Sequence, residues 1–228
     1  MNLAIIYGSE SLLLKPFINN FHGKIIRIYN NRIPIKKKNC IDFQLCDSFE
    51  KNFSDFLDRE YKNFKKIIFL GVAFATDKKL FWAEKKEDLN KNIETNIINY
   101  IKLTKLILPY MMRIKSGKFI YFSSFRASLS TRGTAIYSSS KAFGEMFFRQ
   151  IGQEYGSVGI TSNILRMGYF DGRILETLGK DAQEKVKKRI SLQRLGSAED
   201  ILKSINFFIE TDYANSGILE LNGGIDFG

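Results

Sequence analysis

Short apolar runs alternate with longer amphipathic stretches along this chain, and that alternation limits the possible folds more than any other feature of the sequence. The runs at 66–71 and 118–123 are apolar almost throughout, which is typical of strands buried on both faces of a sheet. Strands separated by helical stretches predict an α/β fold with a doubly wound parallel sheet of about seven strands. The predicted strands are 3–7, 24–29, 41–46, 66–71, 118–123, 160–165 and 217–221.

Helical stretches lie between these strands and complete a three-layer α/β/α arrangement. The chain has 228 residues and shows no repeat, linker or low-complexity tract, so we expect a single domain over 1–228. Ligands of such sheets bind at the carboxyl ends of the strands, and functional residues are therefore expected just after the predicted strands. The predicted helices are 12–21, 49–62, 87–114, 134–156 and 198–210, with a less regular helical stretch at 173–189.

The charge and the hydropathy pattern bear on possible partners. The formal net charge is +11, but the lysines are spread along the chain without a basic helix or an aromatic-basic platform. This pattern favours a solvated basic surface over nucleic-acid binding. No apolar run approaches the roughly 18–20 residues that cross a bilayer, so no membrane partner is expected.

The cysteines and the single histidine restrict the chemistry further. Cys40 and Cys46 flank a predicted strand that would hold them roughly 20 Å apart, beyond disulfide reach. The opening segment 2–7 is too short for a signal-peptide core, and reduced thiols in such a chain indicate a cytoplasmic protein. His22 lies near the end of the first predicted helix, so neither a histidine triad nor a metal site is expected.

A tyrosine and a lysine begin the predicted helix 134–156. Tyr137 and Lys141 are separated by i, i+4 spacing, which places the phenol and the ammonium on one helix face. A neighbouring ammonium lowers the pKa of a phenol from about 10 and suits it to exchange a proton with an alcohol or carbonyl. Ser124, at a strand end, would hydrogen-bond the same substrate oxygen. Taken alone, this pairing is more often a surface pair.

The context of this pair resembles a known family. Ser124 precedes Tyr137 by 13 residues (137 − 124), and Asn96 lies in the segment Asn-Ile-Ile-Asn-Tyr of a predicted helix. Together with 137–142, 117–124, 159–163, 194–201 and 217–224, these segments resemble the short-chain dehydrogenase/reductase family in the same order. The resemblance implies a Rossmann-type fold and an NAD(P)-dependent oxidoreductase that interconverts a carbonyl and an alcohol.

The family also implies roles for individual residues. Tyr137 would be the acid/base, Lys141 would hold the nicotinamide ribose and tune Tyr137, and Ser124 would orient the substrate oxygen. Asn96 would support a water relay; its alternative is to cap or bridge backbone at a helix kink. Ser123 is the alternative to Ser124 if the strand register differs. A homodimer or homotetramer is expected by resemblance.

The cofactor turn departs from the family pattern Thr-Gly-x-x-x-Gly-x-Gly. The segment 7–14 reads Tyr-Gly-Ser-Glu-Ser-Leu-Leu-Leu, with serines where two glycines belong and Glu10 near the place of the pyrophosphate. Ser11 could cap the next helix, and Pro16 predicts that this helix is irregular or begins later than Leu12. The cofactor contacts expected by resemblance are Gly8, Ser9, Ser11, Leu12, Arg32, Asp47, Ser48, Gly71, Val72, Ala73, Tyr137, Lys141, Met167, Gly168 and Phe170.

Cofactor preference depends on the end of the second predicted strand. NAD enzymes place an acid there to bond the ribose 2′-hydroxyl, but this chain has no acid before Asp42. Arg32, or less favourably Arg27, would instead meet a 2′-phosphate, so we expect NADP, with NAD as the alternative. Asp47 and Ser48 resemble the acidic site beside the adenine, and a helix N-cap is a compatible alternative.

The sequence leaves more than one substrate class and more than one overall function open. Arg126, Arg132 and Arg173 lie on loops expected to border the pocket, which suits a small-molecule carbonyl or alcohol that is anionic or carrier-bound; general basicity is the alternative. The eroded glycine turn supports a competing function, a cofactor-poor family member that acts as a binding or regulatory subunit.

Overall fold

Seven parallel strands form one sheet in the order β3-β2-β1-β4-β5-β6-β7. The computed structural model describes residues 1–30, 34, 37–76, 79–171 and 179–225. The chain builds outward from β1 to β3 and then crosses to β4 on the other side of β1, which is the doubly wound topology expected. The strands are β1 Asn2–Tyr7, β2 Gly23–Tyr29, β3 Cys40–Gln44, β4 Lys66–Gly71, β5 Gly117–Ser124, β6 Ile160–Met167 and β7 Ile218–Leu221.

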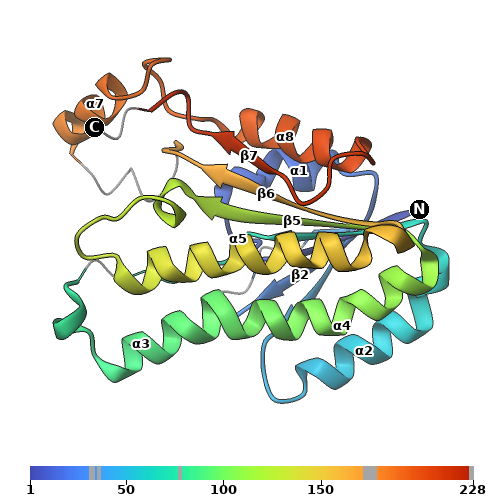
Figure 1. Ribbon diagram of the computed structural model, residues 1–228. Coiled ribbons are helices and arrows are strands. Elements are labelled where there is room, and N and C mark those ends of the chain that lie inside the picture. The colour runs from blue at the N-terminus through green and yellow to red at the C-terminus, as the bar shows by residue number, and fades with distance from the viewer. Residues whose placement is uncertain (31–33, 35–36, 77–78, 172–178, 226–228) are drawn as a thin grey trace.

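Helices cover both faces of the sheet (Figure 1). Helices α2 to α5 pack on one face, and α1 and α8 pack on the other. Alternate residues of β1 explain this arrangement, since Leu3 and Ile5 enter one hydrophobic core while Ala4 and Ile6 enter the other. The helices are α1 Lys15–Asn20, α2 Phe49–Glu60, α3 Lys86–Ile93, α4 Asn99–Ile114, α5 Ala135–Tyr155, α7 Lys180–Lys188 and α8 Ala198–Glu210.

All seven predicted strands are confirmed, but two predicted helices are divided. The segment predicted as one helix over 87–114 is α3, a π-helical turn at Glu94–Ile98, and α4. The helix predicted over 12–21 is a 3₁₀ turn, Leu12–Leu14, followed by α1. Pro16 lies in the first turn of α1, where a missing N–H costs nothing, so the later start is confirmed. Residues 172–178 of the stretch predicted at 173–189 lie outside the described residues.

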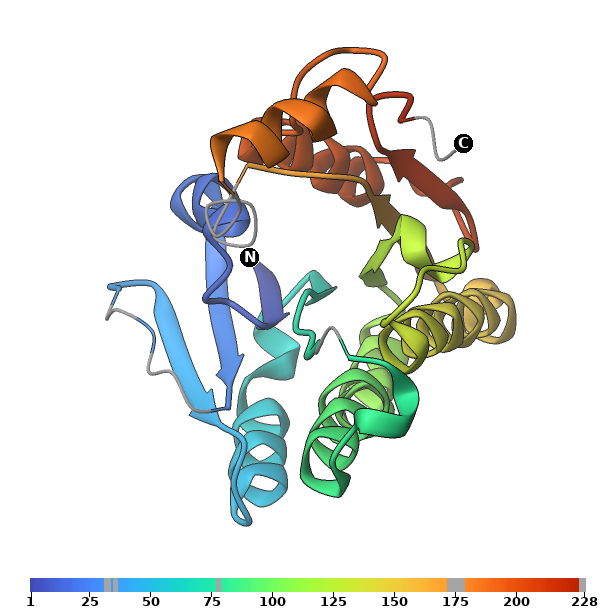
Figure 2. The same cartoon turned by 90° about the vertical axis from the view of Figure 1, so that its left-hand side faces the viewer.

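The carboxyl ends of the strands meet at one edge of the sheet, which faces the viewer in Figure 2. Strand register brings Tyr7 beside Gly71, and Ser124 beside Met167. The predicted site residues Gly71, Ser124 and Met167, on three different strands, therefore lie along the same edge. Within the described part of the chain, no helix is both long and apolar enough to cross a membrane. The single-domain organisation over 1–228 stays a prediction.

Candidate active site

Ser124 and Tyr137 meet at the carboxyl edge of the sheet. Ser124 ends β5, and Tyr137 lies in the first turn of α5, the helix that follows. A hydrogen bond joins the Ser124 hydroxyl and the Tyr137 phenol. Ser123, the alternative, is buried and its hydroxyl donates to Glu145 Oε1 at 2.7 Å. The structure therefore places Ser124, and not Ser123, beside the phenol.

Lys141 lies one helical turn beyond Tyr137, and its side chain is 2% exposed. Its ammonium donates to the Phe122 carbonyl oxygen at 2.7 Å. The nitrogen also lies 4.9 Å from the ring centroid of Tyr121, 5.7 Å from that of Phe74 and 6.0 Å from that of Tyr137. Burial among these rings lowers the pKa of Lys141 to about 7, and the charge of Glu145 only partly opposes this.

The pKa of Tyr137 is raised in this structure, which corrects the expectation that Lys141 lowers it. Burial of the phenol is the largest cause, and it outweighs the lowering by the Ser124 hydrogen bond and by the charge of Arg126. Lys141 has a pKa near neutrality itself, so it is not a permanent cation beside the phenol. At neutral pH the phenol therefore holds its proton.

Asn96 occupies the π-helical turn between α3 and α4. Its Nδ2 donates to the Ala75 carbonyl oxygen, and its Oδ1 accepts from the Ala75 N–H, both at 2.8 Å. The side chain thus bridges backbone at a helix irregularity, which is the structural alternative stated for this residue. π-Helical turns often occur at functional sites because they re-aim backbone groups. A role of Asn96 in a water relay stays a prediction.

Two residues that the sequence did not point to hold α5 against the sheet. A Cβ on Gly144 would lie 2.3 Å from Cζ of Tyr121, so the helix packs directly on that ring. Glu145 accepts from Arg166 at 2.8 Å and 2.6 Å and fixes the helix to β6. A signal existed, because Tyr137, Lys141 and Glu145 repeat every four residues and so share one helix face.

The turn after β1 is held tightly against the loop after β4. Gly8 has φ +93°, and a Cβ there would lie 2.4 Å from the backbone nitrogen of Ala73. The N–H groups of Val72 and Ala73 donate to the Tyr7 carbonyl oxygen at 2.9 and 2.8 Å. These contacts keep Gly8 and the loop 71–73 together at the edge of the sheet.

The serines of this turn behave differently from one another. The Ser9 hydroxyl is buried and has no hydrogen-bond partner among the described residues. Ser11 precedes the 3₁₀ turn Leu12–Leu14 but makes no side-chain capping bond, so the expectation of a Ser11 cap is wrong. The reason is local: a short 3₁₀ turn, and not an α-helix, follows it.

The residues expected around the adenosine half of a cofactor are only partly placed. Asp47 is exposed, and Ser48 is the N-cap residue of α2 but makes no side-chain capping bond, so the N-cap alternative is not realised in full. Arg27 is buried and bonds both carboxylate oxygens of Asp42, at 2.7 and 2.8 Å. Arg27 is therefore committed to the sheet. Arg32 lies outside the described residues.

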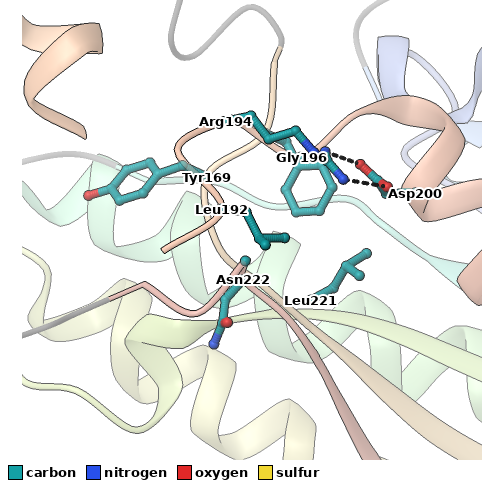
Figure 3. Close-up of a pocket in the computed structure, with 9 residues that line it drawn as sticks. Tyr169, Leu192, Arg194, Gly196, Asp200, Leu221 and Asn222 are labelled. Atoms are coloured by element: carbon teal, nitrogen blue, oxygen red, sulfur yellow. Dashed lines mark hydrogen bonds and ion pairs between the residues drawn. The ribbon is translucent and has the colours of Figure 1, made fainter. Parts of the chain in front are cut away.

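The loop after β6 carries the last of the expected cofactor contacts. Met167 ends β6, and Gly168 donates its N–H to the Leu221 carbonyl oxygen at 2.9 Å. Phe170 is 8% exposed and belongs to the hydrophobic core, which leaves little of its side chain for a ligand. Beside this loop lies a small hollow in which Arg194 is paired with Asp200 (Figure 3).

The residues present fit a nicotinamide dinucleotide in part. The buried, unpartnered Ser9 hydroxyl and the left-handed Gly8 suit a phosphate-binding turn. Phe74 opposes the fit, because its ring lies edge-on to Tyr137 with the centroids 6.0 Å apart and close to the ammonium of Lys141. Phe74 is 40% exposed, so its ring can turn toward solvent without leaving a cavity in the core.

Metal-binding side chains are scattered among the described residues. Within the described ranges, no group of three or more histidine, cysteine or acidic side chains could hold a metal ion. Cys40 and Cys46 are both free thiols.

Comparisons with known proteins identify the family of this chain. A family model described as enoyl-(acyl-carrier-protein) reductase matches residues 48–225. The 3-oxoacyl-(acyl-carrier-protein) reductase FabG of Escherichia coli (strain K12) is 28% identical over 160 residues, which are 69% of this chain and 66% of the relative, slightly less than two thirds of its length. The same enzyme of Buchnera aphidicola subsp. Baizongia pistaciae is 27% identical over 192 residues, 83% of this chain and 78% of the relative.

A solved structure supports the fold. A crystal structure described as a candidate gluconate dehydrogenase from Agrobacterium tumefaciens superposes with a TM-score of 0.84 at 18% identity and covers 98% of this chain and 95% of its own. Because the family match extends from α2 to beyond β7 and includes β5, α5 and β6, the chain belongs to the short-chain dehydrogenase/reductase family.

Proposed function

We propose that this chain is an NAD(P)-dependent oxidoreductase that interconverts a small carbonyl compound and its alcohol, with Tyr137 as acid/base. The observation that carries the proposal is the meeting of the Tyr137 phenol and the Ser124 hydroxyl beside the buried ammonium of Lys141. A bound nicotinamide dinucleotide would supply or accept the two electrons of the reaction.

The residues of the chain divide the remaining work. Ser124 and Tyr137 would both hydrogen-bond the substrate oxygen and stabilise the charge that develops on it. Because the pKa of Tyr137 is raised, the phenol is protonated at neutral pH and is ready to donate, which favours carbonyl reduction. Lys141, with a pKa of about 7, would exchange protons with Tyr137 and hold the nicotinamide ribose.

The proposed cofactor is NADPH, with NADH as the alternative. Gly8, Ser9, Ser11 and Leu12 would hold the pyrophosphate, and Arg32 the 2′-phosphate. The loops 47–48, 71–73 and 167–170 would border the remaining parts. Support comes from the absence of an acid between the second strand and Asp42, which itself is paired with Arg27.

The proposal extends to location and assembly. The free thiols of Cys40 and Cys46 support a cytoplasmic location. Membership of a family whose members are commonly dimers or tetramers supports a homo-oligomer, and the unclustered lysines support a site for a small molecule in preference to nucleic acid.

The test is Tyr137→Phe, assayed by NADPH oxidation over a panel of small ketones, 3-oxo esters and oxo acids. We expect a loss of turnover of about 10³-fold, because the proton donor is removed, with NADPH binding by calorimetry changed less than about threefold. The control is Tyr155→Phe, at the far end of the same helix, which should retain activity.

Two results would contradict the proposal. Near-wild-type turnover in Tyr137→Phe would remove Tyr137 from the chemistry. No heat and no thermal shift of the wild-type protein at millimolar NADPH or NADH would indicate the cofactor-poor binding protein instead.

A further inference from the structure

Arg126 has no acidic partner among the described residues, and its guanidinium carbon lies 5.3 Å from the ring centroid of Phe125. Arg126 belongs to the 3₁₀ turn Phe125–Ala127, directly after Ser124, and its backbone N–H donates to the Ser124 hydroxyl oxygen at 3.3 Å. Its positive charge acts on the Tyr137 phenol. Nη1 is shielded from solvent and has no hydrogen-bond partner among the described residues, while the side chain as a whole is only half-buried. The guanidinium therefore lies at the border between the site and solvent.

Three other arginines of the described chain are neutralised by acidic side chains. Arg27 is paired with Asp42, Arg166 with Glu145 and Glu220, and Arg194 with Asp200, the last as Figure 3 shows. Burying part of a guanidinium costs free energy unless an acid and hydrogen bonds compensate. Among the described residues, no acid lies within ion-pair distance of Arg126. The anion that compensates this charge is best supplied by a ligand.

We propose that Arg126 binds the carboxylate of the substrate, and that the chain acts on small oxo acids whose carboxylate lies one or two carbons from the reacting carbonyl. This inference rests on the proposed function, since it names the substrate class of the same site. A guanidinium binds a carboxylate through two parallel hydrogen bonds, which would orient the carbonyl oxygen toward Ser124 and Tyr137.

The position of Arg126 favours small oxo acids over carrier-bound acyl groups as substrates. A 3-oxoacyl thioester carries a neutral group at the place where an oxo acid carries its carboxylate, and its phosphate lies at the far end of a long flexible arm. An arginine that adjoins Ser124 and acts on the phenol of Tyr137 matches an anion close to the carbonyl. It would gain nothing from a distant phosphate.

The experiment compares acids with their methyl esters at the same carbonyl. Acetoacetate and pyruvate are assayed against methyl acetoacetate and methyl pyruvate, with NADPH, in wild type and Arg126→Gln. We expect wild type to prefer the acids by at least about 100-fold in kcat/KM, because an unpaired buried charge rejects the ester. Arg126→Gln should lower kcat/KM for the acids by about 100-fold and for the esters by less than about fivefold.

Two further variants sharpen the assignment. Arg126→Lys keeps the charge but loses the two-pronged geometry, so its kcat/KM for the acids should fall between those of wild type and Arg126→Gln. Arg149→Gln removes the same charge from an exposed side chain of α5 and should leave the acid-to-ester preference unchanged. An equal loss in both glutamine variants would overturn the assignment to Arg126.

Binding in a protein that cannot react separates this inference from the proposed function. Acetoacetate is titrated by calorimetry, with NADPH present, into Tyr137→Phe and into Tyr137→Phe combined with Arg126→Gln. We expect the second change to weaken binding by at least tenfold. If wild type reduces no carbonyl but this difference persists, the proposed function fails and the carboxylate site stands. If wild type and Arg126→Gln reduce acids and esters alike, the carboxylate site fails and the function stands.

Discussion

The two sides of the carboxyl edge differ in how their polar groups are held. Around β5, α5 and β6 the side chains are linked to one another: Ser123 to Glu145, Glu145 to Arg166, and Arg166 to Glu220. Around the turn after β1, the fixed contacts are mainly between backbone groups, and the Ser9 hydroxyl has no partner among the described residues. The family match begins at residue 48 and so leaves β1 to β3 outside.

This difference has a physical reason. Proton transfer needs a particular side chain at a particular place, whereas a phosphate can be held by backbone N–H groups whatever their side chains are. The turn is nevertheless weakened. Helix α1 has six residues, so few aligned peptide dipoles add to its positive end. We therefore expect the proton-transfer side to be intact and cofactor affinity to limit activity.

The largest effect that would test this comparison is on stability, through Lys141. Its pKa in the folded chain is about 7, below the ordinary value, so between pH 7 and about 10.5 the unfolded chain binds more protons. The free energy of unfolding should therefore rise with pH in this window, while below pH 7 the cost of burying the ammonium is borne in full. Lys141→Met removes this dependence.

The measurement is urea unfolding of both proteins at pH 7.5 and 9.5. The stability of wild type minus that of Lys141→Met should increase by about 2 kcal/mol over this interval. Lys105→Met, which removes an exposed ammonium from α4, is the control. If the stability difference between wild type and Lys141→Met does not vary with pH, Lys141 is accessible to water. The residues around Tyr137 and Lys141 would then exclude water less well than the burial of Lys141 indicates.

The next largest effect is on NADPH affinity, through Phe74. This residue lies between the turn after β1 and the residues around β5, α5 and β6. The ring of Phe74, in the loop after β4, lies edge-on to Tyr137 and close to the ammonium of Lys141. Phe74→Ala should tighten NADPH binding by about tenfold, because the cofactor no longer has to displace the ring. Calorimetry measures this, with Phe81→Ala, an exposed aromatic residue on a separate turn, as control. Weaker binding would mean that Phe74 packs on the cofactor.

The smallest effect is on cofactor preference, through Arg32. Arg32→Ala should lower the ratio of NADPH to NADH affinity by about fivefold, because a single ionic contact to a 2′-phosphate contributes modestly. Fluorescence or calorimetric titration with both cofactors measures the ratio, and Arg59→Ala on α2 is the control. An unchanged ratio would remove Arg32 from the proposed site and leave the choice between NADP and NAD open.

Sequence patterns predicted the central strands well because strands such as 66–71 are nearly unbroken apolar runs buried on both faces. The i, i+4 spacing placed Tyr137 and Lys141 on one helix face, whereas Ser124 was assigned to the same site through the family resemblance. Backbone bridging by Asn96 at a helix kink was stated as an alternative, but the π-helical turn itself was not predicted, because apolar periodicity does not mark a single turn of a different helix type. The pKa of Tyr137 was misjudged because burial is set by the whole fold.

The close contact between Gly144 and the ring of Tyr121 has a mechanical consequence. Tyr137 and Lys141 lie two turns and one turn nearer the start of α5, so they travel with the helix as parts of one rigid rod. A closely packed interior has no space for an added methyl group. A methyl group at position 144 would therefore shift or tilt α5 as a whole. For the proposed proton donor Tyr137, the thickness of the Tyr121 ring would therefore set how far the phenol reaches toward a substrate, and the absence of a side chain at Gly144 keeps this spacing.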